Sequence, residues 1–340
     1  MQKIAIIGLG FMGTMHAQIY QQLREATLVA VVDKEQAKAK RDLAKLGIDA
    51  RVFGTLEEML RACEVDVVDV CLPTDLHAPF ALRAIAAGKH VFCEKPLALT
   101  KAEGKKIAAA AKKAGVFFQV GQCIRFWPEY MAFEAFVKSG KAGKLRSLSL
   151  QRRAGRASYS TEDWLNDGNR SGGAALDLHI HDTDFVHHLL GRPDAVASVG
   201  TRDKSGWSHI FTTYHFKDVA VTAEGGWNYP ANWGFQMAFQ AVFENGAVEF
   251  DSGASPTLLA TVGKGNKSPL PFKVPGAGES KTGAGNLSSL GGYYNELSAF
   301  IECLEKKKAP KIATGEQAAD SLATALAEIQ SAATGRTVKL

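Results

Sequence analysis

The stretch Lys3-Ile4-Ala5-Ile6-Ile7-Gly8-Leu9-Gly10-Phe11-Met12-Gly13 decides the fold of this chain. Its apolar, β-branched start predicts a buried strand, and the Gly-x-Gly-x-x-Gly that follows predicts a tight turn into a helix. Gly8 permits the turn, Gly10 lets the backbone approach a pyrophosphate, and Gly13 lets the helix pack on the strand. The helix N-terminus at Phe11 and Met12 would hold the phosphates. Glycine-rich turns without a ligand are common, but a position between strand and helix favours a dinucleotide site.

An acidic residue, Asp33, follows the second apolar run (28–32), about twenty residues after the glycine turn. A carboxylate there accepts hydrogen bonds from both adenosine ribose hydroxyls and repels a 2′-phosphate. We therefore expect NAD as the cofactor. Lys34 beside it could tolerate a phosphate, which keeps NADP as an alternative.

The composition is that of an ordinary globular protein with room for two domains. The chain has 340 residues, of which 46% are hydrophobic and 22% charged. A net charge of +5 with scattered Lys and Arg predicts no nucleic-acid partner. We see no signal peptide and no run near the roughly 18 apolar residues of a membrane span. The five cysteines form no Cys-x-x-Cys pair and are expected to be reduced thiols. We expect a cytoplasmic protein without a membrane partner.

Strands and helices are predicted to alternate over the first 120 residues. The expected strands are 3–7, 28–32, 50–53, 67–72, 90–93 and 116–120, and the expected helices are 12–23, 36–46, 56–62, 78–87 and 101–114. Apolar strands joined by helices indicate a parallel sheet covered on both faces. The fold class is thus α/β, with a doubly wound Rossmann domain at 1–121 that binds ligands at the carboxyl ends of its strands.

After Gly121 the pattern changes to that of an α+β domain, 122–340. A helix at 128–138, a strand at 145–153 and a helix at 174–190 precede strands at 195–201, 209–216, 219–227, 235–243 and 247–250. Strands without intervening helices predict a large, open, mostly antiparallel sheet. The Gly-, Ser- and Pro-rich segment 271–292 is expected to be an extended excursion. Helices at 293–307 and 316–333 close the chain and could pack back on the first domain.

Glu94-Lys95-Pro96 ends the fifth predicted strand. A lysine at that sheet edge points into the crevice where a nicotinamide would lie. Its ammonium can stabilise negative charge that develops on a substrate oxygen. From position alone, a surface lysine beside Glu94 is an equally good interpretation.

The segment 171–184, SGGAALDLHIHDTD, is the second polar cluster. A continuous helix would place Asp177, His181, Asp184 and His188 on one face. An Asp four residues before a His can orient the imidazole and raise its basicity, which suits a general base. The apolar residues within this segment argue against the interpretation that its polar side chains simply form a solvent-exposed helix face. Four histidines lie within ten residues, but His179 and His181 would point to different faces, so we expect no metal.

These motifs, in their order and spacing, resemble the Gfo/Idh/MocA (glucose–fructose oxidoreductase / inositol dehydrogenase) family. The resemblance rests on the glycine turn, the run Pro73-Thr74-Asp75-Leu76-His77, Glu94-Lys95-Pro96 and the Gly172-Gly173 turn before Asp177 and His181, and it continues through Tyr294-Asn295-Glu296-Leu297 to the closing helix before Val338. It implies a Rossmann domain, a second domain with a large open sheet, a nicotinamide cofactor, and a sugar, cyclitol or polyol substrate. It also implies a homodimer or homotetramer formed through the open sheet.

The resemblance assigns roles to individual residues. Lys95 matches the motif lysine, and Asp177 and His181 match the Asp–His pair, with His181 as acid/base. Beyond Gly8, Gly10, Phe11, Met12, Gly13, Asp33 and Lys34, the implied cofactor contacts are Leu72, Pro73, Thr74, His77, Glu94 and Lys95. Thr74 stands where the family usually has Asn. His179 stands where glycine is common, which would put an extra polar group near the substrate pocket.

Two further residues occupy places where such enzymes contact substrate. Arg125 follows the sixth strand and Trp164 precedes the Gly-Gly turn. Arg125 could equally be an ion-pair partner at the domain interface, and Trp164 could be a core residue.

Three functions are compatible with this pattern. The first is a dehydrogenase. The second uses transient oxidation to a keto-sugar, followed by elimination that cleaves a glycosidic bond. The third is a non-catalytic NAD-binding sensor, which the presence of both Lys95 and His181 disfavours. The substrate itself cannot be named from the sequence.

Overall fold

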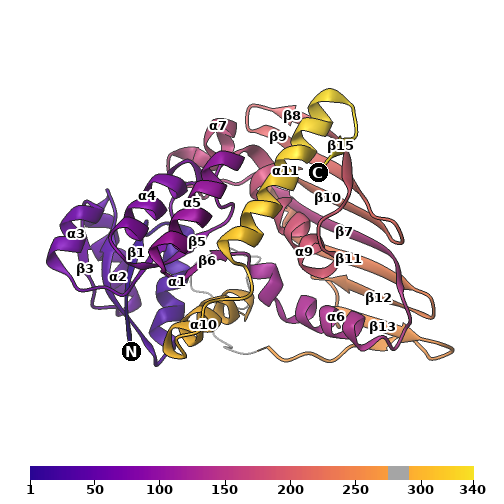
Figure 1. The fold of residues 1–340 in the computed structure, drawn as a ribbon, viewed down its shortest axis with the longest axis horizontal. Helices are drawn as coiled ribbons and strands as arrows, with labels where there is room; N and C mark the ends of the chain where they lie inside the picture. The colour runs from indigo at the N-terminus through magenta and orange to yellow at the C-terminus, as the bar shows by residue number, and fades with distance from the viewer. Residues whose placement is uncertain (275–290) are drawn as a thin grey trace. The chain divides into compact units, whose positions relative to one another are not determined.

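The computed structural model describes residues 1–274 and 291–340 (Figure 1). The chain divides into two compact units. The first comprises Met1–Cys123, Tyr159–Glu162 and 291–319, and the second comprises Ile124–Ser158, Asp163–Val274 and Asp320–Leu340. Residues 275–290, which hold most of the predicted excursion 271–292, lie outside the described residues.

The first unit is built on a six-stranded parallel sheet. In spatial order its strands are β3 (Arg51–Phe53), β2 (Ala26–Val32), β1 (Gln2–Ile7), β4 (Val67–Val70), β5 (His90–Glu94) and β6 (Phe118–Gly121). Its helices are α1 (Phe11–Gln22), α2 (Gln36–Leu46), α3 (Leu56–Ala62), α4 (Thr74–Ala86), α5 (Lys101–Ala114) and α10 (Gly291–Glu305). This strand order is that of the dinucleotide-binding fold, so the predicted doubly wound Rossmann domain is confirmed.

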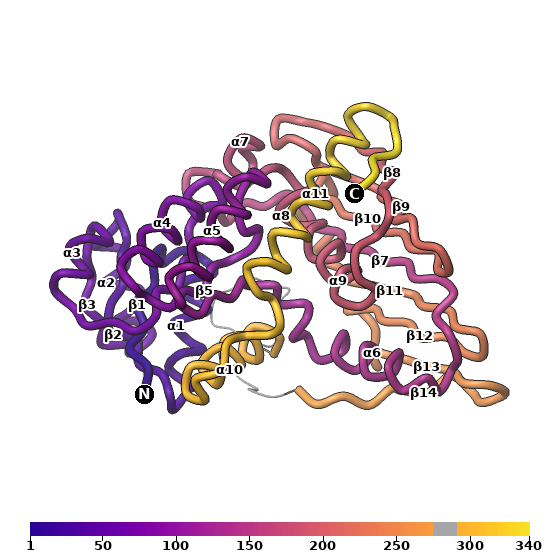
Figure 2. Tube along the Cα trace, in the orientation of Figure 1, coloured from indigo at the N-terminus to yellow at the C-terminus, as the bar shows by residue number. Residues whose placement is uncertain are grey.

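The core of the first unit explains why α10 belongs to it. Leu297 and Phe300 are fully buried and join the apolar cluster that contains Ile4, Ile6 and Phe92. Far apart in sequence, α10 and α1 lie side by side (Figure 2). The apolar face of α10 therefore completes the cover over the sheet.

Helix α4 begins at Thr74, one turn earlier than the predicted start at residue 78. A start at 78 would put Pro79 in the first turn, where proline is favoured. The structure instead places Pro79 inside the helix, which forgoes one main-chain hydrogen bond. As a result Thr74 and His77 lie in the first turn of α4.

The second unit contains a nine-stranded sheet. Its spatial order is β14 (Ser268–Pro269), β13 (Leu258–Val262), β12 (Gly246–Asp251), β11 (Phe235–Phe243), β7 (Leu145–Gly155), β10 (Ala220–Tyr229), β9 (Gly206–His215), β8 (Ala195–Asp203) and β15 (Val338–Lys339). Neighbouring strands run antiparallel except for the parallel pair β7–β10. The predicted large, mostly antiparallel sheet is confirmed.

One face of this sheet carries the core of the second unit. The helices of this unit include α6 (Pro128–Ser139), α8 (Gly173–Asp177), α9 (Ile180–Leu190) and the part of α11 (Gly315–Thr334) from Asp320 onward. Tyr130 of α6 joins them to the sheet, because its ring centroid lies 4.8 Å from that of Phe185 in α9 and 5.1 Å from that of Phe239 in β11.

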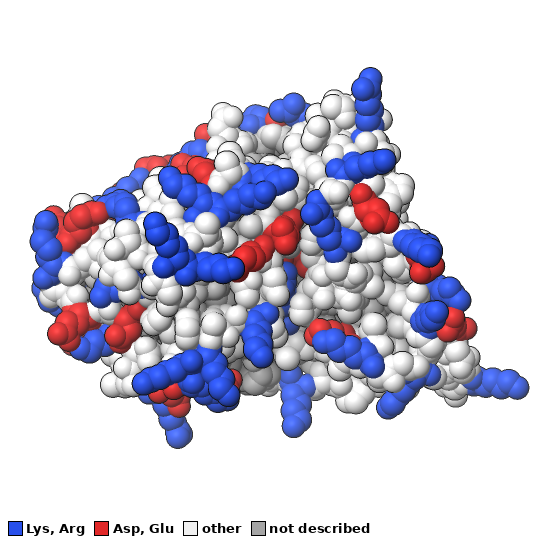
Figure 3. All heavy atoms as spheres, in the orientation of Figure 1, with Lys and Arg blue, Asp and Glu red and all other residues white. Residues whose placement is uncertain are grey.

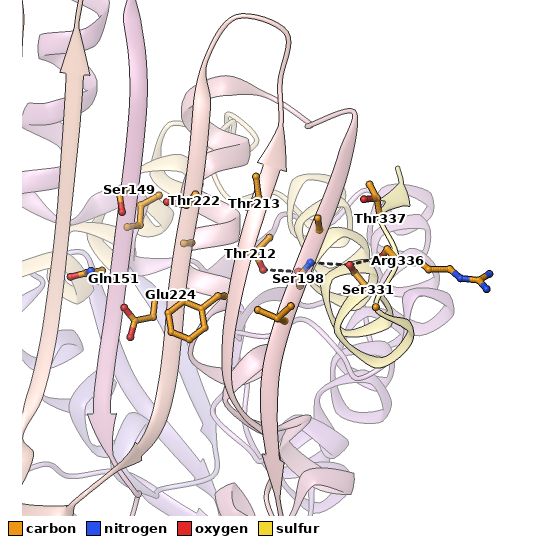
Figure 4. Close-up of a pocket in the computed structure, with 16 residues that line it drawn as sticks. Ser149, Gln151, Ser198, Thr212, Thr213, Thr222, Glu224, Ser331, Arg336 and Thr337 are labelled. Atoms are coloured by element: carbon orange, nitrogen blue, oxygen red, sulfur yellow. Dashed lines mark hydrogen bonds between the residues drawn. The ribbon is translucent and has the colours of Figure 1, made fainter.

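The opposite face of the sheet exposes apolar side chains. Val199, Phe211 and Val242 are 66%, 49% and 49% exposed. A shallow hollow on this face is lined by Ser149, Gln151, Thr213, Thr222 and Glu224 among others (Figure 4). This face is therefore mixed in character, with apolar side chains among short polar ones.

Charged side chains of both signs are interspersed over the face of the molecule drawn in Figure 3. Among the described residues, none of the helices combines the length and the apolar character that crossing a membrane requires.

Candidate active site

The glycine turn has the geometry of a phosphate cradle. Gly8 has φ +89°, and a Cβ there would lie 2.7 Å from the Cys71 carbonyl oxygen. A Cβ on Gly13 would lie 2.0 Å from the Gly8 carbonyl oxygen, whereas one on Gly10 would meet nothing within 4 Å. Gly10 also caps α1 without a side-chain hydrogen bond, and the first turn holds no acidic residue. The first turn of α1 thus carries neither a capping side chain nor a carboxylate of its own, which fits a pyrophosphate at the N–H groups of Phe11, Met12 and Gly13.

Asp33 is held beside that turn. Its Oδ2 accepts a hydrogen bond from the Leu9 N–H at 2.8 Å, and its Oδ1 accepts one from the Glu35 N–H at 2.7 Å. Each carboxylate oxygen can accept more than one hydrogen bond. The group is thus preorganised to receive ribose hydroxyls at the carboxyl end of β2.

A distant segment, Tyr159–Glu162, lies over the same turn in the first unit. The ring of Tyr159 is 5.2 Å from that of Phe11, and the Glu162 carboxylate forms an ion pair with the Lys34 ammonium. Sequence analysis missed both residues, because Tyr159 lies in a loop and Glu162 in the short 3-10 helix Thr161–Asn166 that follows it, and neither carries a sequence pattern. Lys34, which we considered as a phosphate partner, therefore already has an acidic neighbour.

The start of α4 links two strand ends. The imidazole of His77 is buried, with Nδ1 2.7 Å from the Pro96 carbonyl oxygen and Nε2 2.7 Å from the Leu72 carbonyl oxygen. Burial lowers the pKa of His77 despite these two acceptors. Pro73 caps the helix, and the buried Thr74 hydroxyl has no hydrogen-bond partner among the described residues. Such an orphaned hydroxyl fits a site that a cofactor completes.

Lys95 lies directly after β5 at the carboxyl edge of the parallel sheet, as predicted. Its backbone N–H donates to Glu94 Oε2 at 3.1 Å. Gly121 at the end of β6 leaves room for Glu94, because a Cβ there would lie 2.9 Å from Oε1. Next to it, Gln122 is buried, and neither amide atom has a partner in the described part of the chain. Sequence analysis missed Gln122, although a polar residue just after a buried strand was a usable signal.

The predicted continuous helix 174–190 is wrong. The N–H of His179 bonds to the Ala174 carbonyl, five residues back, at 2.8 Å, and the N–H of Asp182 bonds to the His179 carbonyl, three residues back, at 3.0 Å. This change of hydrogen-bond register separates α8 from α9. Asp177 ends α8 and His181 lies in the first turn of α9, so the break falls between these two residues, and their pairing stays a prediction.

Helix α9 is fixed by buried ion pairs. The Arg152 guanidinium binds Asp182 at 3.1 and 2.8 Å, and that of Arg125 binds Asp184 at 2.6 and 2.7 Å. His181, which is 8% exposed, precedes both aspartates. The ion-pair role that the sequence left open for Arg125 is therefore present, inside the second unit, and its contact with substrate stays a prediction.

His179 is a buried residue of the second unit. Its side chain is fully buried, with Nε2 3.0 Å from Glu328 Oε2 and 3.3 Å from the Tyr214 hydroxyl. A Cβ on Gly225 would lie 2.6 Å from the His179 Cβ. The imidazole thus packs into the interior of the second unit, and its place near the substrate pocket stays a prediction.

Trp164 lies in a short 3-10 helix, Thr161–Asn166. It is half-buried against the apolar cluster that includes Leu165, Leu178 and Trp227. The core interpretation of Trp164 thus has a packing basis, while a substrate contact stays a prediction.

Two sets of side chains in the described residues come close enough to share an ion. Both include His16, once with Asp69 and Cys71 and once with Glu94 and Glu296. The histidines of 179–188 belong to neither set.

Comparison with known proteins covers most of the chain. The family model described as "Oxidoreductase family, NAD-binding Rossmann fold" matches residues 2–122, and the "GFO/IDH/MocA C-terminal domain" matches residues 130–249. A myo-inositol 2-dehydrogenase of Thermotoga maritima is 27% identical over 99% of this chain and 98% of its own length. A D-glucoside 3-dehydrogenase of Escherichia coli is 32% identical over 58% of this chain and 56% of its own length.

Among solved structures, a levoglucosan dehydrogenase in complex with NADH and levoglucosan has a TM-score of 0.84. It is 20% identical and the match covers 99% of each chain. At that identity the likeness concerns the fold.

Proposed function

Because this chain belongs to the Gfo/Idh/MocA family of NAD-dependent oxidoreductases, we propose that it transfers a hydride between a nicotinamide and a sugar, glycoside or cyclitol. The reacting group would be a secondary hydroxyl or the corresponding ketone. The observation that carries the proposal is the carboxyl edge of the parallel sheet, where the glycine turn, Asp33 and Lys95 follow β1, β2 and β5. The substrate class is supported by the relatives that act on inositol and on a D-glucoside.

The cofactor is NAD rather than NADP in this proposal. The fixed carboxylate of Asp33 can accept both ribose hydroxyls and would repel a 2′-phosphate. The pairing of Lys34 with Glu162 weakens the cation that could otherwise attract that phosphate. When bound, the nicotinamide supplies the hydride acceptor or donor.

The proton chemistry falls to three side chains. His181 accepts the hydroxyl proton during oxidation and returns it during reduction. Asp177 orients the imidazole and favours its protonated form. The Lys95 ammonium donates a hydrogen bond to the substrate oxygen and stabilises the negative charge that develops there. The buried ion pairs of Asp182 and Asp184 hold His181 in place, which supports its assignment as the base.

The experiment that tests this proposal is a panel of inositols, monosaccharides and glycosides incubated with NAD and scored by NADH absorbance. We expect NADH to accumulate with at least one compound, and the signal to disappear in Lys95→Met and His181→Ala. Accumulation that both variants retain would exclude the assigned roles.

A second candidate function uses the same residues for glycoside cleavage. It is favoured by the likeness to a D-glucoside 3-dehydrogenase. Oxidation of a ring hydroxyl to a ketone, with NAD as the oxidant, would acidify the adjacent C–H. Loss of that proton would expel the aglycone as an alcohol and leave a double bond, to which water would add. Reduction of the ketone would then return NADH to NAD. Product analysis separates the two functions, because cleavage without net NADH supports only this second one.

We also propose that a second copy of the chain covers the exposed sheet face, giving a homodimer or homotetramer. The exposed Val199, Phe211 and Val242 support this interface, since burying apolar surface favours association. A cytoplasmic location, without nucleic-acid or membrane partners, completes the proposal.

A further inference from the structure

A buried group of ionisable side chains lies at the carboxyl end of β5, and the proposed reaction does not use it. His16 of α1, Glu94 of β5 and Glu296 of α10 have ligand atoms within 4.8 Å of one another. His16 and Glu296 are 0% exposed and Glu94 is 4% exposed. Buried charges are costly unless they are paired and hydrogen-bonded. We therefore ask which of these three side chains carry a proton.

One side of His16 is well provided with partners. Its Nδ1 lies 2.8 Å from Asp69 Oδ2, which also accepts a hydrogen bond from the Tyr20 hydroxyl at 2.9 Å. Burial opposes a charged imidazole here, but the neighbouring Cys71 and Asp69 outweigh it and raise the pKa of His16. The ring is therefore oriented by Asp69, and its Nε2 is turned toward the glutamates.

The other side of His16 is short of hydrogen bonds. Nε2 lies 3.2 Å from Glu94 Oε1, without the alignment of a hydrogen bond. Neither carboxyl oxygen of Glu296 has a hydrogen-bond partner among the described residues. Burial, and after it the negative charge of Glu94, raise the pKa of Glu296 well above its ordinary value. The charge of His16 opposes this rise without outweighing it, and no described group donates a hydrogen bond to the Glu296 carboxyl oxygens.

We propose that Glu296 is held as a neutral carboxylic acid whose O–H donates to Glu94, and that this pair positions Lys95. Glu94 is then the acceptor of the pair, with Oε1 accepting from Glu296 and Oε2 accepting from the Lys95 backbone N–H at 3.1 Å. A second negative charge on Glu296 would repel the Glu94 carboxylate and disturb that bond. Glu296 and Glu94 are positioning residues in this account, which rests on the proposed role of Lys95.

The surroundings support this pairing. Glu296 lies on the face of α10 that also buries Leu297 and Phe300, and the Gln119 side-chain amide donates to the Glu296 backbone carbonyl at 3.1 Å. These contacts fix the helix backbone at Glu296, and its carboxyl group is enclosed in the core. The ionisable groups around it are Glu94 of β5, His16 and Tyr20 of α1, Asp69 of β4, Cys71 just after β4, and Tyr293 of α10 itself.

The first test compares the stability of the wild type and Glu296→Gln across pH. An unfolded glutamate titrates near pH 4.3, whereas the native one holds its proton to higher pH, so the native state binds more protons and loses stability as pH rises. The glutamine variant does not titrate. Above about pH 4.3 the unfolding equilibrium constant of the wild type should therefore rise relative to that of Glu296→Gln, by up to about tenfold per pH unit.

The control is Glu302→Gln, which removes an exposed carboxylate from the same helix. The proposal would be overturned if the stability difference between Glu296→Gln and the wild type did not change above about pH 5. That result would mean that Glu296 has the same pKa in the native and the unfolded protein. A divalent metal that copurifies with the wild type and is lost in Glu296→Gln would also overturn it.

The second test separates positioning from packing. Glu296→Met keeps the bulk and removes the O–H, so kcat should fall at least about tenfold, as expected for one hydrogen bond to a charged group. The dissociation constant for NAD should stay within about twofold, because the cradle at Gly8–Gly13 is untouched. Glu296→Gln, whose amide can donate to Glu94, should restore most of the rate.

Equal activity of the methionine and glutamine variants would refute the positioning role. Should Glu296→Met fail to fold, the pH test on Glu296→Gln still decides the protonation. Full activity of Lys95→Met would instead refute the proposed function. The pH-dependent stability of Glu296→Gln would still report whether Glu296 is protonated.

Discussion

Replacing Asp33 with serine should weaken NAD binding and narrow or reverse the preference over NADP. The carboxylate is held by the N–H groups of Leu9 and Glu35 at 2.8 and 2.7 Å, beside the cradle. In the proposed complex it would therefore accept the ribose hydroxyls without rearrangement. Serine keeps a short polar side chain and removes the charge.

The size of the effect follows from the bonds that are lost. A hydrogen bond to a charged group contributes about 1.5–3 kcal/mol, so losing one such bond to a ribose hydroxyl weakens NAD about 10- to 150-fold. NADP gains at the same time, because the repulsion between a carboxylate and a 2′-phosphate is removed. The ratio of the two dissociation constants should shift by at least about tenfold.

A second variant, at Glu162, tests the same preference and should have a smaller effect. Its ion pair with Lys34 is exposed, with 59% and 61% of the two side chains accessible. Exposed pairs contribute no more than about 1 kcal/mol, so Glu162→Gln should improve NADP binding by about fivefold at most. Combining it with Lys34→Met should abolish that gain.

The assay is a titration of each variant with NAD and NADP, followed by protein or nucleotide fluorescence. Asp42→Asn is the matched control, because Asp42 pairs with Lys38 and Lys45 on α2 and its loss changes the net charge equally. A wild type that binds NADP tenfold better than NAD, or an unchanged ratio in Asp33→Ser, would refute the reasoning.

Four further results are expected. His181→Ala should slow hydride transfer by roughly 10²–10⁴ with NAD affinity nearly unchanged, whereas His179→Gly should mainly destabilise the fold; rates and thermal unfolding check both. The second change takes the imidazole from the buried Glu328 carboxylate and leaves it the Thr183 hydroxyl as a hydrogen-bond donor. Lys95→Met should lower kcat by about 10² or more, and Lys95→Arg should rescue poorly, as steady-state kinetics will show. Activity should survive prolonged chelation with EDTA, and loss with recovery on adding zinc would demote His181 from base to ligand. Phe211→Glu on the exposed sheet face should shift the mass in light scattering toward the monomer, and an unchanged mass would argue against that interface.

The first unit was predictable because its signals are local. A strand, a glycine turn and a helix follow one another in eleven residues, and Gly8 and Gly13 are required there by contacts of 2.7 and 2.0 Å at the Cβ positions. Lys95 could be placed at the sheet edge for the same reason, since it follows an apolar run. Asp33 likewise follows directly from the end of β2.

The break between α8 and α9 was not predictable in this way. The residues from Ala174 to Leu190 are all compatible with one helix. The register change at His179 accompanies contacts with Glu328 and with the space left by Gly225, both far along the chain. Such tertiary contacts override a helical pattern without leaving a local signal.

The same limit applies to the residues that sequence analysis missed. Tyr159 and Glu162 lie in a short segment, 159–162, that belongs to the first unit although its neighbours in sequence belong to the second. Glu296 looks like an ordinary helical glutamate until Glu94 is found close to it. Pairings across such separations come only from the fold. Gln122 is the exception, because its place after β6 could have been noted.

The central claim is that this chain moves a hydride from substrate carbon to NAD. The most direct measurement incubates the wild type with NAD and inositols, monosaccharides or glycosides that carry deuterium on their carbinol carbons, and determines the mass of the recovered cofactor. The account predicts NADH with one added deuterium for at least one compound, and none from Lys95→Met or His181→Ala. Recovery of unlabelled NAD alone with every compound, from a protein that binds NAD and leaves each compound intact, would contradict it.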